Sequence, residues 1–140
     1  MVCPILEYAA PAWSPYTSKY VFKIEQVQKN AAHFVTNNYH PRASTSELVS
    51  QLNWDSLENR RLFVQAVFFY KISNNLVNIN FPSEVQPNLR LTRTNSHKFK
   101  QIQSNVLAYN FSFFPRTVRT WNQLSTKVVG APTLELFKSD

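Results

Sequence analysis

Seven basic residues stand together in the C-terminal half of the chain with no acidic residue among them. Between Glu84 and Glu135, fifty residues pass without a carboxylate, whereas the rest of the chain holds eight basic and eight acidic residues. The formal net charge of +7 therefore belongs to this stretch. Its cations are Arg90, Arg93, Lys98, Lys100, Arg116, Arg119 and Lys127. This asymmetry attracts a polyanion, and nucleic acid is the commonest polyanion in a cell. An acidic protein face is the alternative partner.

Six of these cations are the predicted contacts to a phosphate backbone: Arg90, Arg93, Lys98, Lys100, Arg116 and Arg119. Arg116 and Arg119 are three residues apart, so a helix would place both on one face, beside its positive N-terminus. The alternative interpretation is a solvated basic face without a ligand.

Alternating aromatic residues accompany the cations. Tyr109, Phe111 and Phe113 are separated by Asn110 and Ser112. Rings in this arrangement can form a platform for unpaired bases, and each stacked base contributes about 1–3 kcal/mol. The alternative is that the three rings cover a small core.

The chain lacks the residue sets that catalysis or metal binding would need. Asp55, Asp140 and the separated glutamates form no pair spaced to share metal ions for phosphoryl transfer. Cys3 and the three histidines do not have the spacing of zinc ligands. Because Gly130 is the single glycine, a glycine-rich phosphate loop cannot be built. We therefore expect a non-catalytic protein with no cofactor and no metal.

Helical patterns dominate the N-terminal half of the chain. These helices must help to position the basic and aromatic residues of the C-terminal half. A short apolar helix is expected over residues 4–10, ended by Pro11. Thr17 or Ser18 is the expected cap of a helix to about residue 37. Ser44 with Glu47 has the pattern of a capping box that opens a third, short helix.

A longer helix is expected to about residue 74, opened by a capping box of Asp55 with Glu58. Apolar residues surround most of its circumference, so this helix is either buried or faces a missing partner. Beyond it, alternation over residues 101–113 predicts a small β-hairpin. Pro115 suits the first position of a helix, and Thr133 suits the cap of a final one.

These patterns predict a mainly α fold, helical bundle-like, with a small β-hairpin in the C-terminal half, which is an α+β class. We expect a helical region over residues 1–75, and the basic loop, hairpin and C-terminal helices over residues 76–140, packed together as one domain. The 44% apolar and 14% aromatic content is typical of a packed core.

Several features bear on where the protein acts. No apolar run approaches 18 residues, so no membrane span is expected. The first residues lack the basic region of a secretory signal. Cys3 is the single cysteine, which leaves no disulfide within the chain and fits a reducing compartment. We expect an intracellular protein of the nucleus or cytoplasm.

Five short segments, in order along the chain, carry the patterns of one family. Residues 52–61 read L-N-W-D-S-L-E-N-R-R and match the pattern L-x-W-x-S-L-E-x-R-R. Residues 112–124 match S-F-F-P-R-x-x-x-x-W-N-x-L. Residues 4–16, residues 24–35 and residues 70–72 supply the other three. Together they resemble the region after the polymerase core of non-LTR (LINE-type) retrotransposon reverse transcriptases.

The resemblance implies the thumb and post-polymerase C-terminal part of such an enzyme. The aromatic-x-Asp-Asp catalytic box of the family has no counterpart in this sequence, so the resemblance implies a fragment without polymerase activity. Its expected role is to hold template RNA or an RNA–DNA duplex without sequence readout, beside an absent polymerase domain. The alternative is a protein-interaction module, or an orphaned retroelement remnant with no independent activity.

Overall fold

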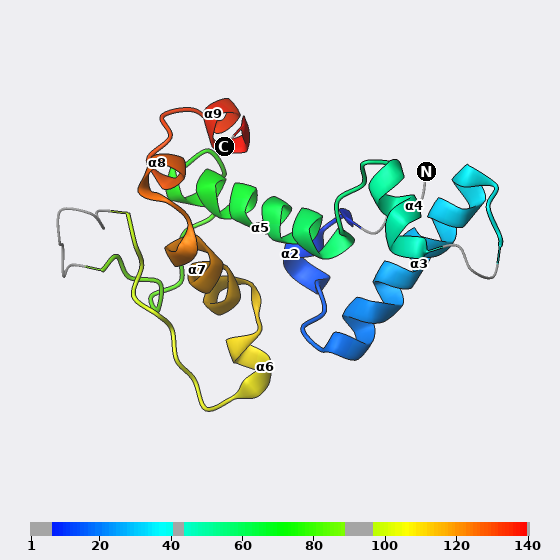
Figure 1. The fold of residues 1–140 in the computed structure, drawn as a ribbon. Helices are drawn as coiled ribbons and strands as arrows, with labels where there is room; N and C mark the ends of the chain where they lie inside the picture. The colour runs from blue at the N-terminus through cyan, green and yellow to red at the C-terminus, as the bar shows by residue number, and fades with distance from the viewer. Residues whose placement is uncertain (1–6, 41–43, 89–96, 140) are drawn as a thin grey trace. The chain divides into compact units, whose positions relative to one another are not determined.

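The computed structural model describes residues 7–40, 44–88 and 97–139. In these residues the regular elements are helices (Figure 1), and the predicted mainly helical class is confirmed. Contacts divide the chain into two compact units, Met1–Arg61 and Leu62–Asp140, here called unit 1 and unit 2. The division falls inside one helix, α5 (Leu57–Ser73), and not at its end. The packing of both parts as one domain stays a prediction.

Unit 1 begins with α2 (Ala10–Trp13), which corrects the predicted role of Pro11. This proline lies in the first turn of α2 and does not end a helix. A proline is tolerated there because the first amides of a helix have no partner within it. Ala9 precedes it in the left-handed conformation, with φ of 51°. Of the helix expected over residues 4–10, residues 4–6 lie outside the described part of the chain, and residues 8 and 9 form a turn before α2.

The next two helices confirm the predicted elements. α3 (Ser18–Thr36) follows Thr17, whose extended backbone forms the N-cap, and ends at Asn37 in the left-handed conformation. α4 (Thr45–Gln51) follows Ser44 and packs against α3. The Ser44 side chain makes no capping hydrogen bond, so the hydrogen bond expected from the capping box is not formed.

The start of α5 differs from the prediction, because Asp55 does not cap it. The Ser56 hydroxyl accepts from the Asn59 amide at 3.2 Å. The Glu25 carboxylate, from α3, accepts from the amides of Leu57 at 3.3 Å and Glu58 at 2.7 Å. A carboxylate at a helix N-terminus satisfies amides that have no partner within the helix and is favoured by the helix dipole. A distant residue therefore supplies the acidic cap.

Glu25 also faces a buried cation. Arg61 is 2% exposed, and its Nη2 atom lies 3.8 Å from Glu25 Oε1. Burial lowers the pKa of the Arg61 guanidinium, while the carboxylates of Glu25, Glu58 and Glu7 oppose this shift. Arg60 pairs with Glu7 at 2.7 Å. The contacts of Glu25 with Arg61 and with the first amides of α5 hold α3 and the first turn of α5 together within unit 1.

Unit 2 has an aromatic core on which the rest of α5 packs. The ring of Phe69 lies 4.9 Å from that of Trp121 in α7 (Phe113–Gln123). Tyr70 stacks on Phe137 of α9 (Leu134–Ser139) at 4.6 Å. These four residues are 0–3% exposed. The part of α5 that belongs to unit 2 thus buries most of its apolar side chains within that unit.

The β-hairpin predicted over residues 101–113 is wrong. The structure has irregular backbone over residues 101–106 and a short helix, α6 (Leu107–Asn110). The Asn110 amide bonds both backbone groups of Ser104, accepting from its N–H at 3.1 Å and donating to its carbonyl. These groups are therefore not available to a strand ladder. Within the described ranges, one isolated antiparallel bridge joins Pro87 and Phe99.

The C-terminal helices follow the predicted order, with one addition. α7 begins at Phe113, so Pro115 is its third residue and not its first. α8 (Thr126–Val129), which the sequence analysis missed, is capped by the Ser125 hydroxyl. The predicted cap of the last helix is confirmed, because Thr133 Oγ1 accepts from the Leu136 amide at 3.3 Å.

Candidate nucleic-acid interface

Nearly all of the excess charge belongs to unit 2. The sequence of this unit contains nine Lys and Arg against three Asp and Glu, so it carries +6 of the +7. In unit 1, six cations face five anions. Two predicted contacts, Arg90 and Arg93, lie outside the described residues. The other four are placed by the segment 97–106 and by α7.

Lys98 and Lys100 are held by the backbone around Phe99. The Asn88 amide donates to the Lys98 carbonyl, and the Lys100 amide donates to the Gln86 carbonyl, both at 2.8 Å. The Phe99 ring packs on Phe69 at 5.2 Å, in the core. Because neighbouring side chains of extended backbone point to opposite sides, Lys98 and Lys100 point away from that core.

The same segment is attached to α7 by one side chain. Asn122 accepts from the Phe99 amide at 3.0 Å and donates to the Phe99 carbonyl at 2.9 Å. Arg119 lies three residues before Asn122, on the same face of α7. Lys98 and Lys100 therefore lie on a segment that is attached to the helix carrying Arg119, and we call these three residues the strip.

Arg119 lines an open polar pocket of about 390 Å³, together with Gln103, Ser104, Asn105 and Asn110. Its guanidinium lies 5.9 Å from the centre of the Phe111 ring. A planar cation stacked on a ring and surrounded by neutral donors is suited to bidentate contact with a phosphate. The sequence analysis missed the four neutral residues because it searched for charge. The many amide and hydroxyl side chains over residues 101–110 were the signal that could have identified them.

The remaining candidates lie in different surroundings. Arg116 is half-buried on α7, one turn before Arg119. Tyr109 is 39% exposed on α6. Phe113 packs edge-on against Phe68 at 5.5 Å and contributes to the core. The three predicted stacking rings therefore do not lie in equivalent positions: Phe111 contacts Arg119, Phe113 packs inward, and Tyr109 presents an exposed ring.

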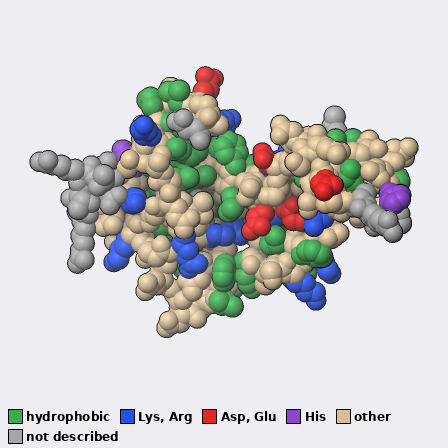
Figure 2. Space-filling view, in the orientation of Figure 1, with side chains coloured by type: hydrophobic (Ala, Val, Ile, Leu, Met, Phe, Trp, Pro, Cys, Tyr) green, Lys and Arg blue, Asp and Glu red, His purple; other side chains and the backbone are tan. Residues whose placement is uncertain are grey.

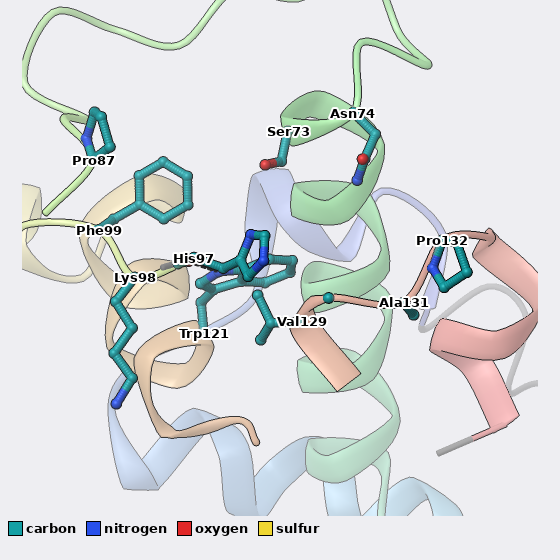
Figure 3. A pocket seen from close by; sticks show the side chains of 11 residues that line it. Ser73, Asn74, Pro87, His97, Lys98, Phe99, Trp121, Val129, Ala131 and Pro132 are labelled. Carbon is teal, nitrogen blue, oxygen red and sulfur yellow. Dashed lines mark hydrogen bonds between the residues drawn. The ribbon is translucent and has the colours of Figure 1, made fainter. Parts of the chain in front are cut away.

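A second pocket, of about 310 Å³, lies where the end of α5 faces the start of segment 97–106 (Figure 3). Ser73, the last residue of α5, and Asn74, which follows it, line one side, and His97 and Lys98 line it from the segment. We call it the His97 pocket. The sequence analysis did not identify it, because its walls come from five separate stretches of the chain.

Figure 2 shows Lys and Arg side chains in several separate groups on the face in view, with hydrophobic and neutral surface between them. In the described part of the chain, no three His, Cys, Asp or Glu side chains gather as a possible metal site. No helix among the described residues is long and apolar enough to cross a membrane.

The geometry therefore places cations of unit 2 on the segment 97–106 and on α7, with one pocket beside Arg119 and another beside Lys98. No protein-family model, curated protein or solved structure matches the chain. The resemblance to reverse transcriptases rests on its five sequence segments.

Proposed function

We propose that unit 2 binds the phosphate backbone of RNA or of an RNA–DNA duplex without reading its sequence. We further propose that the chain is the non-catalytic C-terminal part of a non-LTR retrotransposon reverse transcriptase. The observation that carries the binding function is the strip of Lys98, Lys100 and Arg119 in a unit with a charge of +6. The sequence segments alone support the family.

The chemistry of the strip favours phosphates over bases. Lysine ammonium groups act as mobile point charges, and Arg119 supplies a planar fork for two phosphate oxygens. Gln103 and Asn105 in its pocket add amide donors that fit phosphate oxygens or a ribose hydroxyl. Such contacts fix a strand in place without sequence information.

The salt dependence of binding tests this function. With about four phosphates neutralised, log affinity is expected to fall with a slope of about −3 to −4 against log salt. Raising the salt from about 50 to about 200 mM should thus weaken binding by about 100-fold. Fluorescence anisotropy with mixed-sequence RNA measures it, with heparin as the control polyanion. Equal affinity at both salt concentrations would contradict backbone binding.

A second candidate, protein interaction, is favoured by the outer surface of α3 in unit 1. Tyr20, Val27 and Phe34 recur every seven residues and are 55%, 38% and 75% exposed. Residues at this spacing form one stripe along a helix. The sequence analysis named the helix now seen as α5 as the one that could face a missing partner. The exposed apolar stripe lies instead on α3.

Substitution of Phe34 tests this candidate. If the stripe pairs with a second copy, Phe34→Ser should shift the self-association observed by light scattering to about tenfold higher concentration, equivalent to about 1.4 kcal/mol. Tyr8→Ser is the matched control, because Tyr8 is 80% exposed and lies outside α3. A monodisperse monomer of the unsubstituted chain at all concentrations would rule out self-association.

A further inference from the structure

Hydrogen bonds attach two sides of the His97 pocket to the core of unit 2. Trp121 Nε1 donates to the His97 carbonyl at 3.0 Å, and Asn122 holds the backbone of Phe99. On the opposite side, the Tyr70 hydroxyl donates to the Ala131 carbonyl at 2.7 Å. Both sides are thus tied to buried core residues of unit 2. A pocket with fixed walls binds a ligand without the entropy cost of ordering them.

The lining combines flat apolar surface with a few polar groups. Phe99, Trp121 and Val129 form apolar surface, and Ser73 and Asn74 add polar atoms. The Asn74 amide nitrogen donates to the Tyr70 carbonyl at 3.0 Å, which leaves its oxygen as an acceptor. Lys98 lines the pocket with its stem, and its ammonium group points away from Phe99 and His97 (Figure 3).

We propose that the His97 pocket holds one unpaired nucleotide of the bound strand. The volume of about 310 Å³ is at the small end of ligand pockets and accommodates a single base. The half-buried Phe99 ring supplies the apolar contact to the base, the Asn74 oxygen and the Ser73 hydroxyl reach its edge, and Lys98 meets a phosphate outside. This inference rests on the proposed function, because Lys98 belongs to the same strip as Lys100 and Arg119.

The test compares two ten-nucleotide strands with equal numbers of phosphates: oligo-adenosine RNA and a strand of abasic sites. Anisotropy gives the ratio of their affinities. A base in the pocket should make the RNA bind about 5- to 150-fold more tightly, as expected for about 1–3 kcal/mol per stacked base. Ser73→Leu, which fills the pocket, and His97→Ala, which removes one wall, should each lower this ratio at least fivefold.

Ser50→Leu is the matched control, because Ser50 is exposed on α4 in unit 1 and should leave the ratio unchanged. If Ser73→Leu does not fold, as judged by circular dichroism, His97→Ala decides the outcome. Equal affinity for both strands in the unsubstituted protein, or an unchanged ratio in the folded variants, overturns the pocket while backbone binding stands. If neither strand binds, the proposed function fails, and NMR titration with adenosine monophosphate then decides the pocket alone: shifts at Ser73 and His97 support it, and their absence overturns it.

Discussion

Trp121→Ala is expected to lower the free energy of unfolding by about 3–5 kcal/mol, the usual cost of truncating a large core aromatic residue. Trp121 is 2% exposed and contacts the rings of Phe69 at 4.9 Å and Phe137 at 5.7 Å. Its removal opens a cavity where α5, α7 and α9 meet. It also removes the hydrogen bond to the His97 carbonyl. Since small domains are stable by about 5–15 kcal/mol, this loss is a large fraction of the total.

Urea unfolding followed by far-UV circular dichroism measures the change. Trp13→Ala is the matched control, because Trp13 is 40% exposed and belongs to unit 1. Trp121→Phe keeps most of the ring and loses the N–H donor, so it should cost less than the alanine variant. Equal unfolding midpoints for Trp121→Ala and Trp13→Ala would show that Trp121 does not organise the core.

The triple variant Lys98→Gln, Lys100→Gln and Arg119→Gln is expected to remove most of the affinity for RNA. Each phosphate contact contributes about 0.7 to 0.9 to the salt slope, so the slope should become shallower by about 2 to 3. At about 50 mM salt, binding should weaken by roughly 100-fold. These side chains are half-buried or exposed, and glutamine keeps most of their length, so the fold should be retained.

The chain contains its own control for this experiment. Lys19, Lys23 and Lys29 on α3 lie in unit 1, and changing all three to glutamine removes the same total charge. Binding through the strip requires the α3 variant to keep most of its salt slope. If both triple variants lose the same affinity, net charge alone drives binding and the strip has no special role.

Sequence patterns were sufficient to predict the helices whose ends are fixed by residues close to them in the sequence. The extended cap at Thr17, the three- and four-residue apolar spacing and the left-handed residue Asn37 define α3 within one stretch of sequence. Thr133 and the last helix behave in the same way. In each case the interactions that fix the boundary lie within a few residues of it.

The errors arose where a distant or competing contact decides the structure. Glu25 caps α5 from more than thirty residues away, a contact that no local motif encodes. The alternation at Tyr109, Phe111 and Phe113 suggested strands, but the bonds of Asn110 to Ser104 favour a compact turn into α6. Side-chain bonds to the backbone compete with a strand ladder, and their outcome depends on the folded chain.

The sequence was sufficient to predict which charged residues belong to the candidate site, but not how the chain arranges them around pockets. Counting Lys and Arg located the cations, because a long stretch without carboxylates is visible in any sequence. The attachment of Phe99 to Asn122 and the pockets beside Arg119 and His97 depend on tertiary contacts. The proposed class of partner therefore rests on sequence patterns, and the proposed place of binding rests on these tertiary contacts.

The division between the two units inside α5 has a consequence for gene rearrangement. A piece cut at residue 62 would start in mid-helix, without the first turn of α5 and without the Ser56 and Glu25 groups that bond its amides. Recombination at this point would leave unpaired helix amides at the start of one product. It would also make Arg61, which is buried in the whole chain, the last residue of the other product. Gene rearrangements that keep the fold should therefore keep unit 1 and unit 2 in one chain.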